Sequence, residues 1–115
     1  MARVSYVGPE GVPDHLREIY DEMASYGPFA SLVGAMAQRP PILEHTFKLL
    51  LALREEGLVA RRHLELALVT VSKLNACEYC VAHHSPFLKV EGVSQEGVER
   101  LPEYADHPEL DDVDK

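Results

Sequence analysis

The sequence predicts an all-α protein, and three observations lead to this fold class. Apolar side chains recur at helical spacing, as at Leu16, Ile19, Tyr20 and Met23. Proline and glycine divide the chain into segments of helical length. The most apolar segment contains β-branched residues, but it is long for a strand and no partner strand is predicted. We expect a bundle of about five to six helices, and residues 1–115 suit one domain.

The first half of the chain is expected to begin with an arm over residues 1–11. A helix over 13–25 follows, because Pro13 suits a first helical turn and Gly27-Pro28 stops the apolar run. Two more helices are then expected, over 29–37 and 41–56. The second is apolar on several sides, so much of it should be buried, and Gly57 is its expected C-cap.

The second half should hold a central helix over 60–74, which is apolar almost all round. A break at Asn75-Ala76 precedes the next helix, with Asn75 as its expected N-cap. That helix runs to about Val90, with a kink at Pro86 or an early end near His84.

A last helix is expected over 95–104, with Ser94 as its N-cap. Residues 107–115 look like the approach to another helix. This predicts a natural short version, a truncated product or a partner that completes the core. The acidic residues between Glu99 and Asp112 are expected to form a solvated face.

Composition narrows the function. The net charge of −8 speaks against nucleic acid and against an anionic membrane surface as partners. The sequence has neither a membrane-spanning run nor a secretory signal at its N-terminus, so we expect a cytoplasmic protein. Two cysteines three residues apart, in a reducing compartment, favour redox chemistry or metal binding over a structural disulfide.

The most informative stretch contains both cysteines. In a helix, Cys77, Cys80 and His84 share one face, whereas His83 points elsewhere. A thiolate that attacks a peroxide gives a sulfenic acid, which a second thiol converts to a disulfide. Cys80 is one turn from His84, which favours Cys80 as the attacking thiol; Cys77 is nearer the helix N-terminus, which favours Cys77.

Glu65 is an acid within the most apolar helix. An ion pair with Arg61 or Arg62, one turn back, would account for it, and a proton relay to the thiols is the functional alternative.

Together, Glu65, Cys77, Cys80 and His84 resemble the motif of the alkylhydroperoxidase D-like branch of the carboxymuconolactone decarboxylase superfamily, with Tyr79 where some relatives carry histidine. The resemblance implies an all-helical homo-oligomer, a trimer or a hexamer. It implies a thiol-dependent peroxidase and disulfide reductase with no metal or other cofactor. Glu65 and His84 would be the proton relay and Cys77 and Cys80 the redox pair. A lipoyl group, a thioredoxin-like protein or a small thiol would donate electrons to reduce a hydroperoxide.

Three alternatives stay open. Zinc could bind Cys77, Cys80, His83 and His84, although one helix face presents three ligands at best. A decarboxylase or lactone-processing lyase would need a base but no thiol pair. A non-catalytic module could use the thiols to switch its assembly.

Overall fold

The computed structural model describes residues 3–25 and 29–115. Across these ranges it is all-helical, with six α-helices and no strand, so the predicted fold class is confirmed. The contacts divide the chain into two compact units, residues 1–56 and 57–115, and each is described by itself. The prediction of a single domain stays a prediction.

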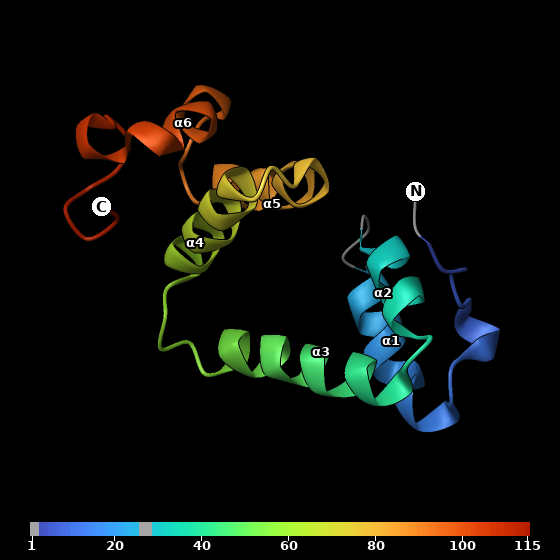
Figure 1. Cartoon of the computed structure of the whole chain (residues 1–115). Helices are drawn as coiled ribbons and strands as arrows, with labels where there is room; N and C mark the ends of the chain where they lie inside the picture. The colour runs from blue at the N-terminus through green and yellow to red at the C-terminus, as the bar shows by residue number, and fades with distance from the viewer. Residues whose placement is uncertain (1–2, 26–28) are drawn as a thin grey trace. The chain divides into compact units, whose positions relative to one another are not determined.

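The first unit contains α1 (Arg17–Ser25), α2 (Ala30–Met36) and α3 (Pro40–Glu55), which pack against one another (Figure 1). Short 3₁₀ helices at Pro9–Gly11 and Asp14–Leu16 precede α1. The stop expected at Gly27-Pro28 lies outside the described residues. The core of this unit consists mainly of Leu16, Tyr20, Met23, Val33, Leu43 and Phe47.

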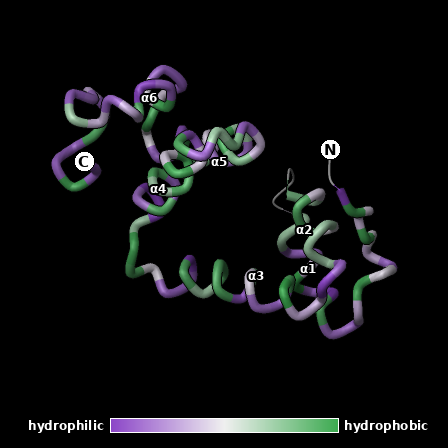
Figure 2. The backbone as a smooth tube through the Cα atoms, viewed as in Figure 1, coloured by the Kyte–Doolittle hydropathy of each residue, from purple (hydrophilic) through white to green (hydrophobic). Residues whose placement is uncertain are grey.

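The extensive burial predicted for α3 is not found within the first unit. Only Leu43 and Phe47 are buried in it, whereas Ile42 and Leu49 are 52% and 61% exposed. Hydrophobic and hydrophilic residues alternate along α3 in Figure 2, and one apolar stripe is enough to contact α1 and α2. Gly57 follows the helix with φ of +63°, as expected for a glycine that ends a helix.

The second unit is built on α4 (Arg61–Leu74) and α5 (Glu78–Val90), which form its main packing contact. Helix α5 continues through Pro86 to Val90, so the early end near His84 is wrong. The predicted N-cap Ser94 is confirmed, because its hydroxyl accepts from the Gly97 amide at the start of α6 (Gln95–Arg100). A 3₁₀ helix, Leu101–Asp106, follows α6.

The tail, residues 107–115, forms turns that return to α4. Arg62 binds Asp114, with Nη2 and Oδ2 2.7 Å apart, and His63 Nε2 lies 3.2 Å from Asp114 Oδ1. The Asp114 side chain is only 1% exposed. Asp114 lies beyond the acidic residues that were expected to form a solvated face, and its charge is compensated by Arg62.

His107 is also buried, with 2% of its surface exposed. Its Nδ1 accepts from the Glu109 amide, so its Nε2 donates to the Gly97 carbonyl, 2.8 Å away. This ring joins the tail to α6. None of the described α-helices combines the length and the apolar composition that a transmembrane segment requires.

Candidate redox site

Cys77 is held between two helices. Its amide donates to the Ser72 carbonyl in the last turn of α4, at 2.8 Å, and its Sγ caps α5 by accepting from the Cys80 amide at 3.4 Å. The N-cap predicted at Asn75 is wrong, because Asn75 is the C-cap of α4. The N-cap of the second helix therefore falls on a cysteine.

Ala76, just before Cys77, has a backbone conformation that is unfavourable for alanine. Its amide bonds to the Lys73 carbonyl at 3.0 Å, and this bond with the one from Cys77 to Ser72 forms the pair that defines a Schellman ending. Such an ending needs a left-handed residue, and Ala76 has φ of +51°. Glycine adopts this conformation without steric cost, whereas an alanine pays about 1 kcal/mol. The junction is thus locally strained beside Cys77.

Replacing Ala76 by glycine should therefore stabilise the reduced protein by about 1 kcal/mol, because glycine removes the steric cost. Urea unfolding with a reductant and a chelator present measures this difference. Ala67→Gly is the matched control, because Ala67 is an exposed residue inside α4, where glycine should destabilise by about 1 kcal/mol. A loss of stability in Ala76→Gly would contradict the strain.

The two sulfurs are neighbours. Cys77 Sγ and Cys80 Sγ are 2.7 Å apart, and both cysteines are free and half-buried. The hydrogen bond from the Cys80 thiol lowers the pKa of Cys77, and the Cys80 amide lowers it further. The same thiol–thiol bond raises the pKa of Cys80, and burial adds to that rise. The pair should therefore lose its first proton at Cys77, while Cys80 keeps its own.

Glu65 and His84 form a second pair across the packed faces of α4 and α5. His84 Nδ1 lies 2.9 Å from Glu65 Oε2, and the Glu65 side chain is 2% exposed. The pairing of Glu65 with Arg61 or Arg62 is therefore wrong: Arg62 binds Asp114, and the Arg61 guanidinium lies 5.2 Å from the centre of the Phe87 ring. When the Glu65 carboxylate is ionised it can only accept hydrogen bonds, so Nδ1–H is then the donor and Nε2 is left for proton exchange.

The structure thus places the four predicted residues in two bonded pairs on one helical hairpin. It also adds a residue that the sequence analysis missed. Ser72 lies two turns after Glu65 on the same face of α4, is 8% exposed, and accepts the hydrogen bond of the Cys77 amide through its carbonyl. The spacing of seven residues from Glu65 is the signal that could have identified it.

His83, the neighbour of His84, lies against a ring rather than in the redox pair. Its ring centre is 3.9 Å from that of Tyr79, with the planes tilted by 31°. No group of three or more His, Cys, Asp or Glu side chains in the described part of the chain is arranged to hold a metal ion.

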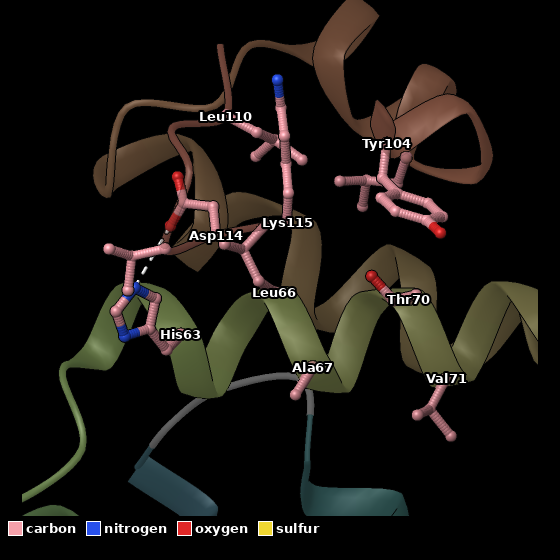
Figure 3. A pocket seen from close by; sticks show the side chains of 11 residues that line it. His63, Leu66, Ala67, Thr70, Val71, Tyr104, Leu110, Asp114 and Lys115 are labelled. Atoms are coloured by element: carbon pink, nitrogen blue, oxygen red, sulfur yellow. Dashed lines mark ion pairs between the residues drawn. The ribbon is translucent and has the colours of Figure 1, made fainter. Parts of the chain in front are cut away.

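A cavity of about 340 Å³ lies on another face of α4 (Figure 3). His63, Leu66, Ala67, Thr70 and Val71 contribute to it from α4, and residues of the 3₁₀ helix and the tail complete the wall. At 100° per residue these α4 positions point away from Glu65 and Ser72. The cavity is therefore separate from the thiols.

Comparison with known proteins gives one match. The model of the Carboxymuconolactone decarboxylase family matches residues 40–106, which is more than half of the chain and includes all four predicted site residues. No curated protein and no solved structure gives a match.

Proposed function

Because the chain belongs to the carboxymuconolactone decarboxylase family, we propose that it is a peroxidase and disulfide reductase of the alkylhydroperoxidase D-like branch. The observation that carries the proposal is the thiol pair at the start of α5. The sulfurs are 2.7 Å apart, and the pKa of Cys77 is lowered. A decarboxylase has no need of two thiols in contact, whereas peroxide reduction needs a thiolate with a second thiol beside it.

The proposed oxidation has two steps, and reduction of the resulting disulfide completes the cycle without a cofactor. One cysteine thiolate attacks the outer oxygen of the hydroperoxide, the O–O bond breaks, and the alkoxide takes up a proton to leave as an alcohol. The sulfenic acid then condenses with the second thiol, forming the Cys77–Cys80 disulfide and water. A dithiol donor returns two electrons and two protons, and is itself oxidised to a disulfide. A lipoyl group, a thioredoxin-like protein or a small thiol has the required chemistry.

Glu65 and His84 supply the proton relay of the proposal. Burial of Glu65 beside His84 Nδ1 orients the imidazole, so that Nε2 can take a proton from a thiol and return it to the leaving alkoxide. Cys77 and Cys80 are half-buried, and Glu65 is buried. Such shielding from water is typical of sites where thiols and carboxylates act as acids and bases.

The proposal includes a homo-oligomer, a trimer or a hexamer, working in the cytoplasm. Apolar side chains in both units support assembly, because they are exposed within their own units: Leu49 and Ile42 in the first unit, and Leu74 and Val71 in the second. Two cysteines poised for repeated oxidation and reduction suit a compartment that supplies reductants.

The test is a count of free thiols per chain, with a chelator present, before and after a small excess of cumene hydroperoxide. We expect two thiols before, none after, and two again once a dithiol is added. Thiols that remain free would contradict the peroxidase. They would instead favour the lyase, whose base could be the Glu65–His84 pair.

Trapping of sulfenic acid by dimedone in single-cysteine variants assigns the attacking sulfur. An adduct in Cys80→Ser assigns it to Cys77, as the lowered pKa favours. An adduct in Cys77→Ser assigns it to Cys80, as its position one turn before His84 favours.

A further inference from the structure

We propose that Phe87 contacts the organic group of the hydroperoxide, and that the site therefore favours hydroperoxides whose organic group is aromatic. The inference rests on the proposed function, because it assigns a partner to the part of the substrate that the thiols and the Glu65–His84 pair do not handle. The observation that carries it is the position of the Phe87 ring beside the His84 imidazole.

Phe87 lies in line with the thiol and the imidazole along α5. Cys80 is followed by His84 one turn later and by Phe87 two turns later, so the three side chains share one stripe of the helix. Helical side chains lean toward the N-terminus, which brings the Phe87 ring over the turn that holds His84. The centres of the two rings are 6.3 Å apart, and their planes are tilted by 58°. An apolar ring thus borders the imidazole on the side away from Cys80.

The Phe87 ring lies nearer the surface than the core of its unit. Phe87 is half-buried, whereas its neighbour Leu88 is buried in the core with Leu66 and Val69. The Arg61 guanidinium lies 5.2 Å from the centre of the ring, which is a favourable placement for a cation over an aromatic face. Arg61 is itself exposed, so this contact holds the ring at the edge of the helical hairpin. The ring therefore keeps some accessible surface for a ligand.

The chemistry of the proposed reaction fixes the direction in which the substrate extends. The thiolate attacks the outer oxygen, an S–O bond forms, and the O–O bond breaks with its electron pair going to the inner oxygen. That alkoxide takes a proton from His84 Nε2 and leaves as an alcohol, so the inner oxygen must come within hydrogen-bond reach of the imidazole. The organic group is attached to this inner oxygen. It therefore lies beside His84, whichever cysteine attacks.

An organic group beside His84 meets the Phe87 ring. Both cysteines precede His84 in the chain, so a substrate that runs from sulfur to imidazole continues toward the C-terminal end of α5, where Phe87 follows. The contact removes apolar surface from water, and two aromatic rings gain further from edge-to-face or offset packing. At low peroxide concentration this binding energy raises the second-order rate constant. An aromatic hydroperoxide should therefore react faster than an aliphatic one of the same skeleton.

Phe87→Ala tests the contact, and Tyr104→Ala is its control. Tyr104 is an aromatic residue of the 3₁₀ helix, 55% exposed, that lines the cavity on the other face of α4. The second-order rate constant of thiol loss is measured with cumene hydroperoxide and with tert-butyl hydroperoxide, which has a methyl group in place of the phenyl group. The readout is the ratio of the two constants, because damage to the thiols or the relay slows both reactions alike.

We expect the unmodified protein to favour cumene hydroperoxide, and Phe87→Ala to lower the ratio about tenfold, because the ring contact and the burial of apolar surface are lost. Tyr104→Ala should keep the ratio of the unmodified protein. An unchanged ratio in Phe87→Ala, with thiols still lost to both peroxides, would overturn the inference and leave the proposed function standing. Thiols that neither peroxide oxidises in the unmodified protein would reject both.

A second pair of variants serves if Phe87→Ala does not fold. Phe87→Tyr keeps the ring, whereas Phe87→Leu keeps an apolar side chain without it. The ratio should stay close to that of the unmodified protein in the tyrosine variant and fall in the leucine variant. Equal ratios in these two variants would contradict a contact between the ring and the substrate.

Discussion

Replacing Glu65 by glutamine is expected to slow the loss of thiols to hydroperoxide about 100-fold at neutral pH, toward the lower end of what general acid–base groups contribute. The amide keeps the shape of the carboxylate and can still accept from His84 Nδ1. It carries no charge, however, so it no longer stabilises a protonated imidazole when Nε2 takes up the proton. The measurement is the rate of thiol loss, followed by quenching and counting.

The control for this variant is Glu96→Gln, which makes the same change at an exposed residue of α6 and should leave the rate unchanged. A rate within threefold of the unmodified protein would reject the relay.

Replacing Arg62 by alanine is expected to lower the free energy of unfolding by about 3 kcal/mol, as for removal of one partner from a buried ion pair. Arg62 holds three segments. Its Nε and Nη2 bind the Asp114 carboxylate, its Nη1 donates to the Glu91 carbonyl at 2.6 Å, and its Nη2 donates to the Glu109 carbonyl at 2.6 Å. The variant leaves a buried carboxylate and two carbonyls without this donor. Urea unfolding followed by circular dichroism measures the loss.

Arg100→Ala is the matched control, because Arg100 pairs with Glu103 at the surface, 3.5 Å away, and such pairs contribute at most about 1 kcal/mol. Lowering the pH should cause part of the same loss in the free energy of unfolding as Arg62→Ala does. The hydrogen bond from Arg62 lowers the pKa of Asp114, so the stabilisation is complete above the ordinary carboxyl pKa and is lost as the pH falls through the folded value. Equal stabilities of Arg62→Ala and Arg100→Ala would contradict this account.

The sequence predicted the helices well where periodicity and local signals agree. Ser94 is followed by an amphipathic segment, and it caps α6 as expected. Periodicity also placed Glu65 and His84 on helices that could face each other. It assigned the N-cap before Cys77 to Asn75, because asparagine is a better capping residue than cysteine. The Schellman ending of α4 occupies Asn75 and Ala76, which moves the cap to Cys77.

Contacts between segments that are far apart in the chain could not be predicted from the sequence. Arg62 and Asp114 are separated by 52 positions, and no local pattern pairs them. The ion pair that the sequence proposed for Glu65 used the nearest cations, Arg61 and Arg62. In the folded structure, Arg62 instead pairs with Asp114 of the tail, and His84 of α5 pairs with Glu65. Exposure of Leu49 and Ile42 is likewise a property of the packing around α3.

The cap formed by Cys77 connects redox state to the integrity of the first turn of α5. As a thiolate, Cys77 Sγ is a charged acceptor for the Cys80 amide at the positive end of the helix. Once the sulfur is bonded to Cys80, the charge is gone and the acceptor is weak. The amide of Cys80 should then exchange its hydrogen with solvent faster in the oxidised protein. The same amide that stabilises the reduced thiolate thus becomes a local reporter of oxidation, readable without any substrate.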